Sequence, residues 1–157
     1  MDTPRGRGAP AHLHGGVVHG EHLRVQHGTW YTKAMNAEGV VAGFIAALER
    51  GDVDGAMGYM APDCEYDNVP MSKAIGHEQI RGVLGMFVGP DSPLEFKVLR
   101  QTATGNVVMN ERVDRLTIGG KHVELPVAGV WEVDPASSKI TLWRDYFDMG
   151  QFNSQMA

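Results

Sequence analysis

The sequence has 157 residues, of which 43% are hydrophobic and 21% are charged, and its net charge is −5. This length suits one domain with one core, and the composition is that of a globular protein rather than a disordered or fibrous one. Lys and Arg are scattered, which argues against a nucleic-acid-binding surface, and the longest apolar stretch is too short to span a membrane. Because the single cysteine excludes an intrachain disulfide framework, we expect a cytoplasmic protein.

Residues 1–34 differ in composition from the rest of the chain. Five of the seven histidines lie there among Gly, Pro and Arg residues, without sustained periodicity. We interpret this segment as a flexible leader and expect a single domain over residues 35–157. No fold signal would hold the histidines in one geometry, so we expect no metal site there. These histidines are His12, His14, His19, His22 and His27.

Three helices are predicted in the first half of this domain. Apolar residues recur at helical spacing over residues 37–50, and Gly51 supplies a C-terminal stop. Asp52 is expected to cap a short second helix, which Pro62 would end. After a brief strand over residues 64–68, apolar residues share one face of a third helix predicted over residues 76–88.

The hydrophobic period then changes to two, which is typical of strands. Four such runs cover residues 94–104, 106–118, 121–133 and 140–148, separated by turn residues that include Gly105 and Gly119-Gly120. Helices followed by strands indicate an α+β protein. We expect three N-terminal helices packed on a curved, mainly antiparallel sheet, forming a cone whose open mouth suits a small ligand.

Polar residues interrupt the apolar faces of two of these strands. In the second run, Asn110, Arg112 and Asp114 lie on one face and form a polar island with apolar residues on either side of it. In the last run, Asp145 lies between Trp143 and Phe147 on one face. Arg-x-Asp on a strand is usually a surface ion pair. Here both carboxylates lie among residues that prefer burial, which favours a buried ionic triad that shares the arginine.

One arginine cannot neutralise two carboxylates. Because guanidinium keeps its proton in proteins, the arrangement of lowest charge combines Arg112 with one ionised and one protonated aspartate. Such a triad places an acid beside a base at neutral pH, which is the condition for push–pull proton transfer. The triad therefore predicts an enzyme active site in the apolar pocket.

Other side chains give weaker signals. Tyr66 and Asn68 share one face of the short strand and are able to bind a water molecule, although an ordinary strand end is the alternative interpretation. Cys64 is expected to be a packed apolar residue rather than a nucleophile. The folded part contains no nucleophile elbow, Walker loop, dinucleotide fingerprint or clustered Cys and His ligands. We therefore expect cofactor-free proton transfer on a small, mainly apolar substrate.

Three segments together resemble the active-site segments of the limonene-1,2-epoxide hydrolase family. They are Glu-Tyr-Asp-Asn-Val-Pro at residues 65–70, Asn-Glu-Arg-Val-Asp at residues 110–114 and Trp-Arg-Asp-Tyr-Phe-Asp at residues 143–148. The resemblance spans about residues 38–152. It implies a cone-shaped fold like that of nuclear transport factor 2 (NTF2) and ketosteroid isomerase, usually a homodimer, with no metal or organic cofactor.

The resemblance also implies a role for each polar residue. Asp145 would take a proton from a water molecule held by Tyr66 and Asn68, while Asp114 would protonate the epoxide oxygen. Arg112 would bridge the two aspartates. The product would be a vicinal diol, formed in one step without a covalent intermediate. By the same matching, the pocket lining is expected to comprise Leu84, Phe87, Leu116, Leu125, Val127 and Phe147.

Phe87 replaces the aliphatic side chain expected from the family and is expected to narrow the pocket. The size of the substrate stays open at this point. Two other functions also stay open. One is an enolising enzyme of the ketosteroid isomerase or polyketide cyclase type, which would need only one carboxylate. The other is a non-catalytic domain that binds an apolar ligand, which would need no buried arginine with two aspartates.

Overall fold

The computed structural model describes residues 36–89 and 92–157. The predicted leader and its histidines lie outside the described residues. In the described part of the chain, no helix is both long enough and apolar enough to cross a membrane. The elements, in chain order, are α2 (Ala37–Glu49), α3 (Val53–Met57), β1 (Met60–Asn68), β2 (Lys73–Ile75), α4 (Gly76–Leu84), β3 (Glu95–Thr104), β4 (Val107–Ile118), β5 (Lys121–Asp134), β6 (Lys139–Tyr146) and α5 (Met149–Met156).

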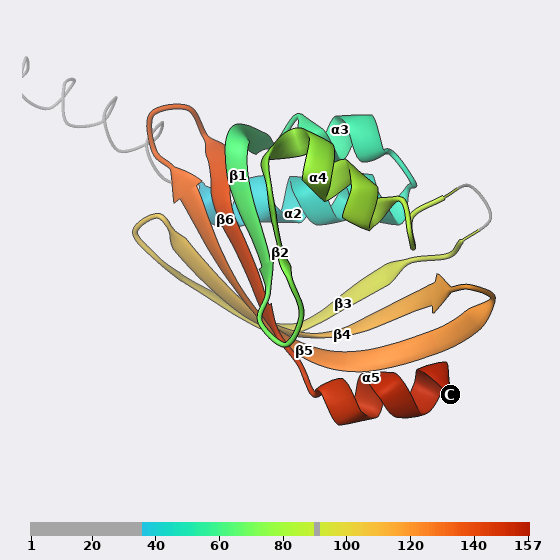
Figure 1. The fold of residues 1–157 in the computed structure, drawn as a ribbon. Helices are drawn as coiled ribbons and strands as arrows, with labels where there is room; N and C mark the ends of the chain where they lie inside the picture. Colours follow the sequence, from blue (N-terminus) through green and yellow to red (C-terminus); the bar gives the residue numbers. More distant parts are fainter. Residues whose placement is uncertain (1–35, 90–91) are drawn as a thin grey trace, which may run out of the picture. The chain divides into compact units, whose positions relative to one another are not determined.

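The strands form one mixed sheet in the order β2-β1-β6-β5-β4-β3. All neighbouring strands are antiparallel except β1 and β6, which are parallel. The sheet bends around α2, α3 and α4, with α2 against β3 to β6 and α4 against β1 and β2 (Figure 1). The prediction of an α+β protein with three helices packed on a curved, mainly antiparallel sheet is confirmed.

The core lies between α2 and the helix-facing side of the sheet. Phe44 of α2 has no exposed surface and meets Trp131 and Trp143 edge-on, with ring centroids 5.6 and 5.1 Å apart. Such edge-to-face contacts add to the stabilisation that comes from burying large rings. The aromatic core therefore fixes α2 against β5 and β6.

Several boundaries follow from local signals that the sequence shows. Asp52 caps α3 by accepting a hydrogen bond from the Gly55 backbone N–H at 2.8 Å. Gly119 and Gly120 adopt positive φ angles of 56° and 81° in the turn between β4 and β5. A tight hairpin turn requires positive φ values, which glycine adopts without strain. The predicted cap and hairpin turn are confirmed.

Two predicted helix ends are wrong. The second helix was expected to reach Pro62, but α3 ends at Met57 and β1 begins at Met60. Pro62 is tolerated inside β1 because the pairing with β6 is irregular between Met60 and Glu65, so no regular ladder bond is lost. The third helix was expected to reach residue 88, but α4 ends at Leu84, where Gly85 caps it.

The short strand β2 and the C-terminal helix α5 were not predicted. Asp148 caps α5 by accepting from the Gln151 backbone N–H at 2.9 Å. Because β6 pairs with β5 only over residues 128–134, the preceding part of β5 lacks that neighbour. Gln155 of α5 binds both backbone groups of Glu124 there, at 2.8 and 3.0 Å. The helix thus satisfies part of the edge of β5.

Candidate functional site

Arg112 lies at the centre of a buried polar cluster. Its side chain has no exposed surface, and Asp114 and Asp145 are only 6% and 3% exposed. Arg112 Nε donates to Asp114 Oδ1 at 2.7 Å, and Arg112 Nη2 donates to Asp145 Oδ2 at 2.5 Å. The structure therefore brings together the three residues that the sequence grouped, with one guanidinium joining two carboxylates.

The sheet register explains how residues from separate strands meet. Asp145 of β6 lies opposite Gly129 of β5, which in turn lies opposite Asn110 of β4. The Arg112 side chain must cross β5 to reach Asp145. A Cβ atom built on Gly129 would lie 2.3 Å from Arg112 Nη1, so any side chain at this position would obstruct the guanidinium.

An apolar cavity of about 180 Å³ lies over this cluster. Its polar lining consists of Tyr66, Asn68, Asp114 and Asp145, while Arg112 lies beneath them and does not contribute to the wall. The cavity is smaller than the ~300–1,000 Å³ of pockets for drug-sized ligands. Its apolar lining consists of Met71, Val83, Met86, Phe87, Phe96, Leu116, Ile118, Val123, Leu125, Val127, Phe147 and Phe152.

Leu84 is not among the lining residues, although it was expected there. It is fully buried in the core, and Val83 faces the cavity instead. Val83 and Phe87 are four positions apart, so they project on the same side of the chain, whereas Leu84 is rotated by about 100° from Val83. The other predicted lining residues do line the cavity: Phe87, Leu116, Leu125, Val127 and Phe147.

Several lining residues escaped the sequence-based prediction. Phe152 belongs to the unpredicted helix α5, and Phe96 lies on β3. Phe152 and Met156 are spaced by one helical turn behind the capping residue Asp148, which is the signal that identifies such a helix. Phe96 alternates with charged residues in its strand, so the sequence indicates that it faces inward, but the register that pairs it with Asp114 of β4 is not evident from the sequence.

Aromatic rings enclose the polar cluster on two sides. Tyr66 stacks on Trp143 with ring centroids 3.8 Å apart, and Trp143 stacks on Trp131 at 5.0 Å. The Arg112 guanidinium lies 5.0 Å from the Phe96 ring and 5.7 Å from the Trp131 ring, within cation–π range. These rings exclude solvent from the guanidinium and restrict its movement.

Burial determines the protonation of the two aspartates. It raises the pKa of Asp114 to about 7, against the opposing effect of Arg112 and with a smaller contribution from Asp145. Burial also raises the pKa of Asp145, and Arg112 again opposes the shift. One proton shared by the two carboxylates at neutral pH leaves the cluster without net charge.

Arg112 and Tyr66 keep their protons. Burial lowers the pKa of Arg112, but Asp145 and Asp114 together raise it further, so the net shift is upward. The pKa of Tyr66 lies above its usual range, first because the ring is buried and second because Asp145 is nearby. The cavity floor therefore presents a neutral hydroxyl beside the aspartate pair.

One oxygen of Asp145, Oδ1, and the indole N–H of Trp143 are both buried without a hydrogen-bond partner among the described residues. Against the effect of burial, the nearby Trp143 side chain lowers the pKa of Asp145. The Oδ2 atom of Asp145 binds Arg112. A carboxylate oxygen without a donor retains its capacity to accept a proton.

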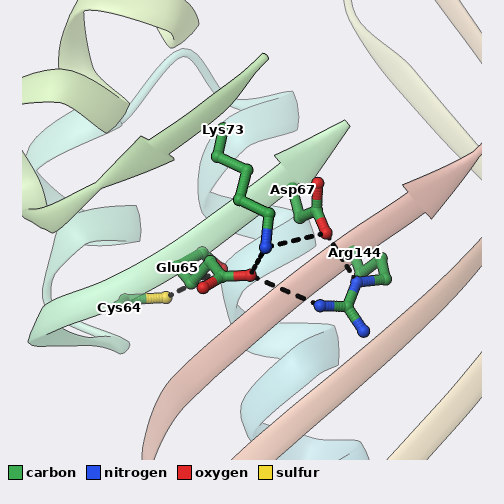
Figure 2. Close-up of polar contacts among 5 residues, drawn as sticks. All are labelled: Cys64, Glu65, Asp67, Lys73 and Arg144. Carbon is green, nitrogen blue, oxygen red and sulfur yellow. Dashed lines mark hydrogen bonds and ion pairs between the residues drawn. The ribbon is translucent and has the colours of Figure 1, made fainter. Parts of the chain in front are cut away.

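The opposite face of β1 and β6 carries a separate ionic network (Figure 2). Arg144 Nε donates to Asp67 Oδ2 at 2.7 Å, and Arg144 Nη2 lies 3.3 Å from Glu65 Oε1. Lys73 of β2 contacts the same two carboxylates, at 2.6 Å from Glu65 and 3.5 Å from Asp67. The network connects β2, β1 and β6, the last two of which hold Tyr66, Asn68 and Asp145 on the cavity side.

Cys64 is not a nucleophile in this structure, and the described residues hold no metal-ligating group. Cys64 is fully buried, and burial together with Asp63 and Glu65 raises its thiol pKa to about 12, so the thiol stays protonated. Its Sγ atom lies toward the Glu65 carbonyl (Figure 2). Among residues 36–89 and 92–157, no three His, Cys, Asp or Glu side chains are grouped to hold a metal ion.

A family model described as the limonene-1,2-epoxide hydrolase catalytic domain matches residues 35–157. The chain belongs to this family. The resemblance drawn from the three sequence motifs is confirmed, as is the prediction of an enzyme of the limonene-1,2-epoxide hydrolase type.

Two epoxide hydrolases that are similar in sequence to this chain support the family assignment. Epoxide hydrolase EphG of Mycobacterium tuberculosis (strain ATCC 25618 / H37Rv) is 38% identical over 109 residues, which cover 69% of this chain and 71% of EphG. A solved M. tuberculosis epoxide hydrolase resembling limonene-1,2-epoxide hydrolase is 36% identical, with a TM-score of 0.65, and the match covers 79% of this chain and 89% of that one.

More distant structures support the fold alone. An NTF2-like protein of unknown function from Cytophaga hutchinsonii ATCC 33406 is 18% identical with a TM-score of 0.61, covering 76% of this chain and 96% of that one. The NTF2-like fold implied by the sequence resemblance is confirmed.

Gly129→Ala tests whether the cluster depends on the space that Gly129 leaves for the Arg112 side chain to cross β5. The added Cβ would push Arg112 away from Asp145, so we expect a loss of about 1–3 kcal/mol in the free energy of unfolding. Urea unfolding measures this change. Gly82→Ala is the matched control, because nothing lies within 4 Å of a Cβ there. A helix interior favours Ala over Gly, so the control should be as stable as the wild type or slightly more stable. Equal stability of the two variants would contradict the crowding at Gly129.

Proposed function

We propose that this protein is a cofactor-independent epoxide hydrolase that adds water to a small hydrophobic epoxide and releases a vicinal diol. The observation that carries the proposal is the pairing of Arg112 with both Asp114 and Asp145 at the floor of an apolar cavity. This arrangement offers an acid and a base within one neutral cluster, and family membership connects such a site with epoxide opening.

The proposed reaction is a single displacement. A water molecule bound near Tyr66 and Asn68 attacks one epoxide carbon while Asp145 takes one of its protons. The bond between that carbon and the epoxide oxygen breaks, and the oxygen takes the proton of Asp114. One water is added, and the cluster finishes with the same number of protons. Transfer of a proton from Asp145 back to Asp114 then restores the starting state.

The assignment of acid and base follows the family resemblance and agrees with the site. Asp114, with a pKa of about 7, keeps a proton that it is able to donate near neutral pH. Asp145 is one of the residues that line the cavity, and among the described residues its Oδ1 atom has no hydrogen-bond donor, which suits an acceptor of the water proton. Arg112 holds one oxygen of each carboxylate and keeps the two groups in different protonation states.

The lining favours a compact apolar substrate. Apart from the polar floor, the cavity wall is made of aliphatic, aromatic and methionine side chains. Phe87 and Phe152 occupy space that smaller side chains would leave open, and the cavity volume is about 180 Å³. We therefore propose a terpene-like or cyclic epoxide. From the family resemblance and the single cysteine, we further propose a cytoplasmic homodimer.

Asp114→Asn and Asp145→Asn test the two catalytic roles. Each change should lower kcat for limonene oxide or cyclohexene oxide by at least ~10²-fold, because each removes one of the two proton-transfer groups. Both variants should fold, since either one leaves Arg112 with one carboxylate and the cluster neutral. Asp54→Asn on the exposed start of α3 is the control and should keep wild-type activity.

In labelled water, the wild-type protein should place one labelled oxygen in the diol, with or without EDTA. Unimpaired turnover by either catalytic-site variant would refute the assigned roles. A loss of activity with EDTA would instead indicate a metal-dependent reaction.

The proposed roles also predict a bell-shaped dependence of kcat/KM on pH. Activity should fall as the pH rises through about 7, because Asp114 then loses the proton that it must donate. Activity should also fall in acid, where Asp145 gains a proton and no longer acts as a base. Initial rates across the pH range measure both limbs, and a rate that stays constant well above pH 7 would contradict Asp114 as the acid.

A further inference from the structure

The third arm of the Arg112 guanidinium has a partner that the proposed mechanism does not use. Arg112 Nη1 donates to Asn110 Oδ1 at 3.2 Å. Asn110 is only 5% exposed and does not line the cavity. Its Nδ2 atom lies 3.4 Å from Gln101 Oε1 on β3. Each of the three donor groups of Arg112 therefore has a different acceptor: two carboxylates and one amide.

This third contact lies in a closed space. A Cβ atom on Gly129 would lie 2.3 Å from Arg112 Nη1 and 2.6 Å from Asn110 Oδ1, so the backbone of β5 passes close beneath the contact. The rings of Phe96 and Trp131 lie near the guanidinium. Arg112 is thus unable to turn its third arm toward solvent or toward another acceptor.

The chemical nature of this acceptor determines the charge of the cluster. An amide oxygen satisfies Nη1 without adding a charge, so the single positive charge of Arg112 faces two carboxylates that share one proton. A third carboxylate in this space would require the cluster to hold another proton to stay neutral. The neutral side chain of Asn110 therefore influences how many protons the aspartate pair holds.

We propose that Asn110 is a positioning residue: its neutral carbonyl group holds Arg112 between Asp114 and Asp145 and restricts the cluster to one shared proton. The proposal rests on the epoxide hydrolysis proposed above. Asn110 acts through Arg112, without touching the substrate. An aspartate side chain has the same shape and would fit at this position, but its negative charge would change the number of protons that the cluster holds.

The charged and titratable groups around Arg112 are few. Asp114 lies on the same strand, Asp145 on β6 and Tyr66 on β1. The residues that α2, β3 and β5 place around this cluster do not titrate; they are Phe44, Phe96, Gln101, Gly129 and Trp131. A change in the pH profile on substitution of Asn110 therefore reports on the aspartate pair.

Asn110→Asp is the direct test, because it keeps the shape and the acceptor oxygen but adds a charge. Asn106→Asp, in the turn between β3 and β4, changes the net charge equally and serves as the control. In Asn110→Asp, both limbs of the pH profile of kcat/KM should move to higher pH by about one unit, since a nearby like charge raises carboxylate pKa values. The Asn106→Asp profile should match the wild type. Identical profiles for the two variants would overturn the proposal.

A measurement without substrate separates this proposal from the proposed function. Carbon-13 NMR of labelled aspartate carboxyl groups follows their titration directly. An upward shift of the Asp114 and Asp145 titrations in Asn110→Asp supports the proposal even if the wild type opens no epoxide, which would refute the proposed function alone. Unchanged titrations would overturn the positioning role even if the wild type is an active epoxide hydrolase.

Asn110→Leu provides a second test if Asn110→Asp does not fold. It removes the acceptor without adding a charge, which leaves Arg112 Nη1 unpaired. We expect kcat to fall about tenfold, because a guanidinium that has lost one buried hydrogen bond no longer holds the two aspartates in their reactive positions. KM should stay the same because Asn110 does not line the cavity. An unchanged kcat in a folded Asn110→Leu variant would overturn the proposal.

Discussion

The site depends on one buried guanidinium that joins two carboxylates beneath an apolar cavity. Arg112 has no exposed side-chain surface, and it donates one hydrogen bond to each aspartate. Burying three ionisable groups is costly unless their charges balance and their hydrogen bonds are made. One proton on the aspartate pair would balance the charge, and in the proposed mechanism the same proton gives the pair its acid and its base. The stability of the cluster and the proposed chemistry therefore have the same requirement, which is one proton on the aspartate pair.

The pairing of the strands in the sheet brings Arg112, Asp114 and Asp145 together. The parallel pairing of β1 with β6 places Asn68 opposite Asp145, and Gly129 leaves space for Arg112 to cross β5. Because side chains alternate across a strand, the same segments hold a second ionic network on the other face, centred on Arg144 (Figure 2). That network pairs its carboxylates with cations from neighbouring strands, so it needs no protonated acid.

Local sequence patterns predicted most of the strands and the polar cluster, whereas most contacts between residues far apart in the sequence could not be predicted. Alternation of apolar residues identified β3 to β6, and the polar residues on otherwise apolar strand faces indicated the grouping of Arg112, Asp114 and Asp145. Helix α5 was missed because its cap, Asp148, is a local signal that needs a helical period behind it, and Phe152 and Met156 alone are too few to establish that period. Val83 rather than Leu84 lines the cavity because of the way α4 is rotated about its axis, which the sequence pattern does not indicate. The register that sets Gly129 beside the guanidinium is a property of strand pairing, which the separate strands do not reveal.

The central claim is that the aspartate pair holds one proton, and counting the protonated carboxylic acids tests it most directly. Infrared spectroscopy of the wild-type protein at slightly acidic pH should show the carbonyl band of one buried protonated carboxylic acid. The band should disappear in both single amide variants of the pair, because each variant leaves Arg112 with one ionised carboxylate. A wild-type spectrum without the band, or a band that persists in both variants, would contradict the shared proton.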